Sequence, residues 1–161
     1  MAAATEPRFD VDSTQLPHSV LHDLPLANSE TDFYANTLVQ VNGDGTAENV
    51  SHSGGDDDSG LAILANLERQ SDKTEEAFTG KMQYDRAGTD PLVELVSGAI
   101  IEFEIDDPVA DFSFKDTVYA VDNQTVSANA GDGSGGTLAE AGRVYQVRES
   151  TVRVLVPGIL G

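Results

Sequence analysis

The C-terminal half of the chain consists of short segments in which apolar and polar residues alternate. In 99–105, Ile101 and Phe103 fall on one face of an extended backbone, whereas Glu102 and Glu104 fall on the other. A period of two residues is that of a β-strand with one buried face, because successive side chains of a strand point to opposite sides. The pattern therefore predicts a sheet in this part of the chain.

Further strands are predicted where similar segments end in turn-forming sequences. Residues 42–45, Asn-Gly-Asp-Gly, are a strong turn signal, and 122–124 and 148–150 each separate two apolar segments. Residues 61–70 fit a short helix or a buried strand equally well. Short strands at intervals of about 8–12 residues predict an all-β fold, a small β-barrel or sandwich with at most one or two short helices. The other predicted strands cover 37–41, 91–96, 117–121, 125–127, 144–147 and 151–156.

Residues 1–33 lack this regular pattern and hold three of the six prolines, Pro7, Pro17 and Pro25. Because proline fixes φ and disfavours a helix just before it, we expect an extended N-terminal arm over 1–33, followed by a β-barrel domain over 34–161. Two interpretations stay open: the arm packs on its own domain, or it lies on a partner. In the second case, its apolar side chains make the contact: Phe9, Val11, Leu16, Val20, Leu21 and Leu24.

The chain ends in two large apolar residues, Ile159 and Leu160, which follow Pro157 and Gly158. Pro157 cannot donate a ladder hydrogen bond, so it turns the chain away from the preceding strand. Ile159 and Leu160 either fold back onto the barrel or contact a neighbouring molecule. We favour the second alternative and count both residues among the predicted contact residues.

The charge of the chain excludes several classes of protein. The chain has 28 acidic and 9 basic residues, a net charge of −19, which opposes binding to nucleic acid or to an anionic membrane. No segment approaches the roughly 20 apolar residues of a membrane span. The absence of cysteine excludes disulfides, thiolate metal sites and cysteine nucleophiles. An acidic surface with few lysines predicts adaptation to molar salt, where repulsion between carboxylates is screened.

The sequence shows no arrangement that would support catalysis. Its three histidines, His18, His22 and His52, lie in the predicted arm and in a polar loop, and no Gly-x-Ser-x-Gly nucleophile motif is present. We therefore expect neither an enzyme nor a cofactor. The Asp-rich loops around Asn42 and Asp44, around 56–58 and around Asp132 leave one bound cation as a lesser alternative, although they lack the spacing of a twelve-residue calcium loop.

Residues 92–157 carry a succession of motifs that resembles a known family. Phe114-Lys115-Asp116-Thr117-Val118-Tyr119 precedes a Gly/Thr-rich hairpin, and the segment closes on 142–144 and 152–156. This order resembles the small β-barrel capsid decoration (cement) proteins of tailed viruses. In that family a G-D-x-V-Y turn and strand, a variable Gly/Thr hairpin and a closing G-x-V…V-x-V strand recur. Lys115 stands where the family pattern usually has glycine.

The resemblance implies a function as well as a fold. A protein of this kind is a virion structural protein on the outer face of an HK97-type capsid, where it binds the major capsid protein, often as a trimer, with an extended arm that adds to strands of the shell. With the acidic composition, the chain looks like a protein of a haloarchaeal tailed virus that is assembled in the host cytoplasm. The alternatives are a tail-tube, head-completion or turret protein of a virion, or a non-viral haloarchaeal β-barrel binding module.

Overall fold

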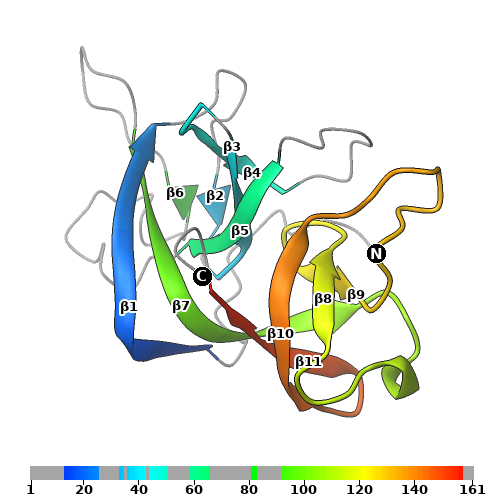
Figure 1. Cartoon of the computed structure of the whole chain (residues 1–161). Helices are drawn as coiled ribbons and strands as arrows, with labels where there is room; N and C mark the ends of the chain where they lie inside the picture. The colour runs from blue at the N-terminus through cyan, green and yellow to red at the C-terminus, as the bar shows by residue number, and fades with distance from the viewer. Residues whose placement is uncertain are drawn as a thin grey trace.

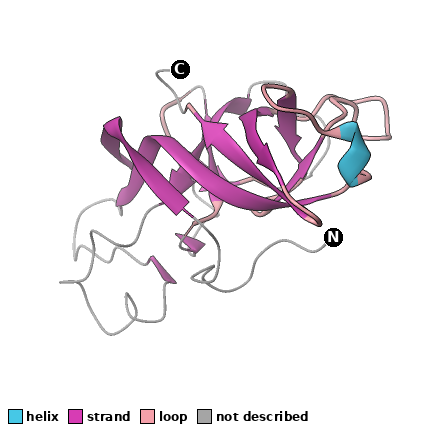
Figure 2. Ribbon diagram, turned by 90° about the horizontal axis from the view of Figure 1, so that it is seen from below, coloured by secondary structure: helices cyan, strands magenta, loops and turns pink. Residues whose placement is uncertain are grey.

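The computed structural model describes residues 13–25, 33–34, 36–42, 44–50, 59–65, 81–82 and 92–157 (Figure 1). These residues form an all-β structure, as predicted, and their one helical segment is a short 3-10 turn, η2 (Val109–Asp111; Figure 2). The strands are β1 (Ser13–Pro25), β2 (Phe33–Tyr34), β3 (Leu38–Asn42), β4 (Ala47–Asn49), β5 (Ser59–Ala65), β6 (Lys81–Met82), β7 (Leu92–Ile105), β8 (Thr117–Ala120), β9 (Thr125–Ser127), β10 (Glu140–Val147) and β11 (Thr151–Val156).

Five strands close a β-barrel in the order β7, β11, β10, β8, β9 and back to β7. Antiparallel pairing joins β7 to β11, β11 to β10, β10 to β8 and β8 to β9. The last pairing, β7 with β9, is parallel and is short: Glu104 faces Thr125 and Ile105 faces Val126. The predicted hairpins across 122–124 and 148–150 are both present, so the sequence correctly predicted a small barrel.

The barrel interior is filled by the apolar faces of the alternating segments. Ile101 and Phe103 of β7 are fully buried, while Glu102 and Glu104 are only partly buried. Full burial of one such apolar side chain stabilises the fold by about 1.5–3 kcal/mol. The same core cluster contains Val118, Val126, Val144, Val152, Val154 and Val156.

Strand β7 is long enough to serve the barrel and a second part of the sheet. Its N-terminal half pairs with β1 on one edge and with β5 on the other, since Val96 has Leu21 and Leu64 as partners at once. Strands β3 and β4 extend the sheet beyond β5 (Figure 1). The two strands predicted at 91–96 and 99–105 are thus one strand, which continues through Gly98 at φ 82°.

Residues 13–25 of the predicted arm are extended, as expected, and form strand β1 of the chain's own sheet. Strand β1 runs antiparallel to β7, from Ser13 opposite Ile101 to Pro25 opposite Leu92, with an irregular register between Gln15 and Val20. Pro17 lies in that irregular stretch, because a proline cannot donate to the ladder. The boundary between an arm at 1–33 and a domain at 34–161 stays a prediction. The segment 61–65, left open between helix and strand, belongs to β5.

Candidate interaction surface

One end of the barrel is held by the carboxylate of Asp107, which follows β7. Its oxygens accept hydrogen bonds from the Ser127 hydroxyl at 2.6 Å, from the Ala128 amide at 2.7 Å and from the Asn129 side-chain amide at 3.0 Å. Burial raises the pKa of Asp107, but these hydrogen bonds outweigh burial and hold the pKa below its ordinary value. The donors fix the acidic turn (residues 106–111) onto the end of β9.

Two of the Asp-rich loops considered as cation sites are organised by hydrogen bonds to the backbone. Asp44 accepts hydrogen bonds from the amide and hydroxyl of Thr46, and Asp132 accepts them from the amides of Ser134 and Gly136. Carboxylates that accept amides in this way are typical of Asx-type turns. Within the described residues, no group of three or more His, Asp or Glu side chains is arranged to hold a metal ion. Residues 56–58 lie outside the described part.

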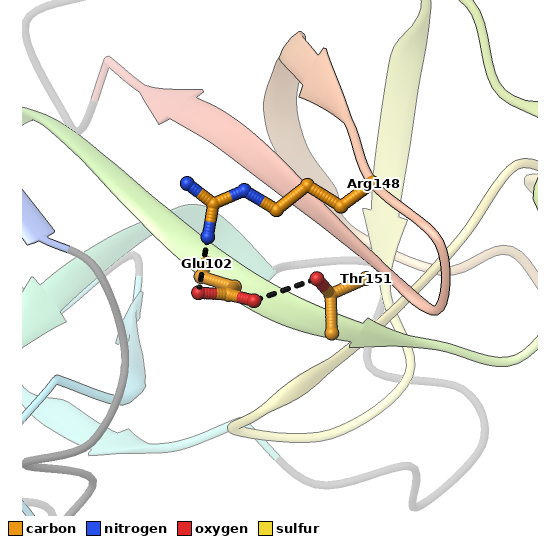
Figure 3. A network of polar contacts seen from close by, with 3 residues as sticks. All are labelled: Glu102, Arg148 and Thr151. Atoms are coloured by element: carbon orange, nitrogen blue, oxygen red, sulfur yellow. Dashed lines mark hydrogen bonds and ion pairs between the residues drawn. The ribbon is translucent and has the colours of Figure 1, made fainter.

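The turn between β10 and β11 is braced against β7 by a polar network (Figure 3). The carboxylate of Glu102 receives a 3.0 Å ion pair from Arg148 and a 2.6 Å hydrogen bond from the Thr151 hydroxyl. Glu102 and Thr151 lie on the outer, partly exposed side of β7 and β11, and Arg148 lies in the turn between β10 and β11. The network ties this turn to β7.

Phe114 and Tyr145 are exposed rings that each lie beside a basic side chain, Lys115 and Arg153 respectively. We call these four residues the aromatic–cation patch. Phe114 is 62% exposed and Tyr145 49%, whereas Arg153 is half-buried. The Lys115 ammonium lies 5.4 Å from the centre of the Phe114 ring, and the Arg153 guanidinium lies 5.6 Å from that of Tyr145. Both pairs fit the geometry of a cation–π contact.

Backbone pairing joins the two segments that carry these ring–cation pairs. The amide of Lys115 donates to the carbonyl of Val144, and the amide of Val144 donates to the carbonyl of Asp116, both at 2.8 Å. Val144 points into the core, so Tyr145 beside it points outward. Tyr145 also occupies the register irregularity between β10 and β11, and Arg153 lies opposite Gln146 there.

The acidic turn, which precedes Phe114 in the sequence, also presents an exposed apolar side chain. Val109 is 36% exposed, and Asp106 and Asp111 on either side of it are exposed as well. The turn is closed by a 2.9 Å hydrogen bond from the Asp111 amide to the Pro108 carbonyl, and Phe112 anchors it in the core. It therefore offers an apolar tip flanked by carboxylates on a fixed backbone.

The contact residues predicted from the sequence are placed only in part. Leu16, Val20, Leu21 and Leu24 lie on β1. Phe9, Val11, Ile159 and Leu160 lie outside the described residues, so their contacts stay predictions. The aromatic–cation patch was not predicted. The sequence held one signal, because Tyr145 follows Val144 at a position where the alternation of the strand expects an outward-facing polar residue.

No helix in the described part of the chain is long and apolar enough to cross a membrane. Comparison of the chain with protein-family models, with curated proteins and with solved structures finds no match.

Proposed function

We propose that this chain is a virion structural protein, not an enzyme, that decorates and stabilises a capsid shell by binding the major capsid protein. The proposal begins from the motif order in 92–157, which resembles the capsid decoration proteins of tailed viruses. Those residues coincide with the strands that close the barrel, β7 to β11. The residues that carry the motifs are thus the residues that form the barrel, which supports the architecture that the resemblance implies.

The observation that best supports the proposal is the backbone conformation of Lys115. At this position the family pattern usually has glycine, and Lys115 adopts φ 74°, in the left-handed region that glycine enters without steric cost. The side chain of Lys115 therefore departs from the family pattern, but its backbone has the conformation to which glycine is suited. A left-handed residue before the strand Thr117–Ala120 is what a glycine in the family pattern would suit, and this likeness supports the proposal.

The acidic composition supports a particular setting for this function. A net charge of −19 on 161 residues suits a protein exposed to molar salt, on the exterior of a virion of a haloarchaeal tailed virus. The same charge disfavours contact with packaged nucleic acid. The partner that we propose is accordingly the outer surface of the shell.

The test is the protein composition of particles purified from cultures that express the chain. Quantitative mass spectrometry should find the chain in a fixed ratio to the major capsid protein, and labelled antibodies should bind intact heads. Removal of the chain by mild denaturation should make the heads less resistant to heat, and adding it back should restore their resistance. A chain that stays in the soluble fraction would refute the proposal, and labelling confined to tails would favour the tail-tube alternative.

A further inference from the structure

The barrel is closed by one pairing that is both short and parallel, that of β7 with β9. It joins Glu104 to Thr125 and Ile105 to Val126, whereas β11 pairs with β7 along its whole length, Thr151–Val156. A parallel ladder is also slightly less stable per residue than an antiparallel one. We call the pairing of β7 with β9 the seam.

The other edge of β9 is joined to β8 by a hairpin that needs only local contacts. The carbonyl of Thr125 accepts the amide of Val121, and the carboxylate of Asp122 accepts the amides of Gln124 and Thr125, each at 2.9 Å. A tight turn closes at a low cost in chain entropy, whereas the acidic turn and β8 separate the two sides of the seam in the sequence. When the barrel opens, β9 should therefore stay with β8 and part from β7.

The seam also contains a buried hydroxyl group without a hydrogen-bond partner. Thr125 is fully buried, and its Oγ1 atom neither donates nor accepts a hydrogen bond within the described part of the chain. A buried polar group that lacks a partner costs free energy, and water would satisfy this hydroxyl in an open state. The closed seam therefore carries a penalty that opening removes.

The carboxylate of Asp107 holds the two strands together just beyond the seam. Asp107 follows β7, and its donors, Ser127, Ala128 and Asn129, are the last residue of β9 and the two residues after it. These hydrogen bonds therefore cross from one side of the seam to the other. Hydrogen bonds to a charged group are stronger than those between neutral groups, so this carboxylate stabilises the closed seam more than neutral contacts would.

We propose that the barrel has an open state in which β9 parts from β7 along the seam, and that Asp107 is the latch that keeps the seam closed. In the open state, the five strands form one continuous sheet in the order β7, β11, β10, β8 and β9, and their antiparallel pairings are kept. Opening of this kind is a sub-global step, which requires less free energy than unfolding of the whole chain. This inference concerns the isolated chain and does not depend on attachment to a particle.

Opening frees backbone groups on both sides of the seam. The amide of Glu104 donates to the carbonyl of Gln124 at 3.1 Å, and the amide of Asp106 donates to the carbonyl of Val126 at 3.0 Å. Both hydrogen bonds are absent in the open state. These two amides and the side chain of Thr125 are therefore the groups that report the opening.

A buried thiol can measure the opening, because the natural chain has no cysteine. Thr125→Cys places a thiol in the seam, and Val154→Cys, at an equally buried position of β11, is the matched control. Rates of reaction with iodoacetamide are measured in molar salt and divided by the rate of the same variant in concentrated urea. Thermal melts check that each variant is folded.

The thiol in the seam should react at least about tenfold faster than the control, because the seam opens without unfolding of the whole chain. Its rate should also rise less steeply with urea, since the slope follows the surface that is exposed on opening. A rate no higher than that of Val154→Cys, or an equal urea slope, would overturn the proposal. Both thiols would then report only the unfolding of the whole chain.

The latch is tested by adding Asp107→Asn to the Thr125→Cys variant. The reaction rate should rise about tenfold, because hydrogen bonds to a charged carboxylate are lost. Asp116→Asn makes the same change of charge at a carboxylate that accepts the amide of Ser113, away from the seam, and should leave the rate unchanged. An unchanged rate with Asp107→Asn, or an equal rise with Asp116→Asn, would show that Asp107 is not the latch.

Hydrogen exchange of the natural chain gives a second test that needs no substitution. The amides of Glu104 and Asp106 should be protected from exchange, but less than the amides of β11, which lies between β7 and β10. Their exchange should also depend less on urea than that of β11. Equal protection and an equal urea dependence in the seam and in β11 would overturn the proposal, whether or not the cysteine variants fold.

Discussion

The amide of Lys115 donates a 2.8 Å hydrogen bond to the carbonyl of Val144, although Lys115 lies at φ 74°. The hydrogen bond holds the turn before β8 against β10, and the turn needs a backbone conformation that costs a residue with a Cβ about 1–2 kcal/mol. The strain at this lysine therefore offsets part of the stability that the pairing provides.

Lys115→Gly should stabilise the fold. Glycine relieves the left-handed strain but loses more backbone entropy on folding, about 0.5–1 kcal/mol, so the expected net gain is about 0.5–1 kcal/mol. Thermal melts should show a rise in Tm of a few degrees. Lys115→Ala is the control: it removes the ammonium from the Phe114 ring but keeps the strain, so it should bring no gain. A lower Tm for the glycine variant would contradict this account.

Asp107→Asn should destabilise the protein in a pH-dependent way. The folded state lowers the pKa of Asp107, so its contribution is complete above the ordinary Asp pKa of about 3.9 and is lost as the pH falls through the folded value. An asparagine NH₂ would also face the donors of Ser127 and Ala128. Urea melts should show a loss of about 1–2 kcal/mol at pH 7 that shrinks toward about pH 2. A difference independent of pH would argue against a role for the charge.

Gly142→Ala should be strongly destabilising. A Cβ at this position would fall against the backbone carbonyl oxygen of Leu155 on the neighbouring strand, which cannot move without breaking the pairing of β10 with β11. We expect a loss of about 2–4 kcal/mol, as for other substitutions that force backbone shifts in a packed core. Gly131→Ala, where the added Cβ meets nothing within 4 Å, is the matched control and should change Tm little.

Deletion of residues 1–30 should leave the barrel folded, because β7, β8, β9, β10 and β11 close on one another without β1. The deletion removes the partner of β7 on one edge from Leu92 to Ile101, so hydrogen exchange should become faster for the amides in 92–101 that bond to β1 and stay slow in 102–105, which pair with β11 and β9. Deletion of residues 1–12, which keeps β1, is the control. If the longer deletion abolished the cooperative melt altogether, β1 would be a necessary part of the folding unit.

Withdrawal of salt should lower the stability of the protein. The 28 acidic residues repel one another, and this repulsion is screened only at high ionic strength. Thermal melts should show a steep fall in Tm between about 3 M and 0.1 M salt. A flat profile would contradict the adaptation to molar salt.

Local pattern was enough to predict much of the barrel. The alternation of 99–105 predicted which side of β7 is buried, and the turns at 122–124 and 148–150 predicted the two hairpins. These features depend on neighbours in the sequence, since the period of two and the turn residues act over a few positions. The same information left 61–65 undecided, because a short apolar run fits a buried strand or a helix equally well.

The candidate interaction surface could not be predicted in the same way. The sequence directed attention to apolar residues at the chain ends, among them Leu21 and Ile159, whose contacts stay predictions. The segments that carry Phe114 and Tyr145 become neighbours only because the carbonyl of Val144 pairs with the amide of Lys115, residues that lie far apart along the chain. No local period encodes such a pairing.

The sequence by itself determined most strands of the barrel, their buried faces and the charge of the chain, because each follows from residue type and short-range spacing. The tertiary structure alone decided that β7 runs unbroken through Gly98, that its last residues pair in parallel with β9 to close the barrel, and that β1 lies along its edge. Barrel closure depends on long-range hydrogen bonds and on the packing of all five strands at once. Which aromatic rings remain outside is a consequence of that closure, and alternation within one strand cannot specify it.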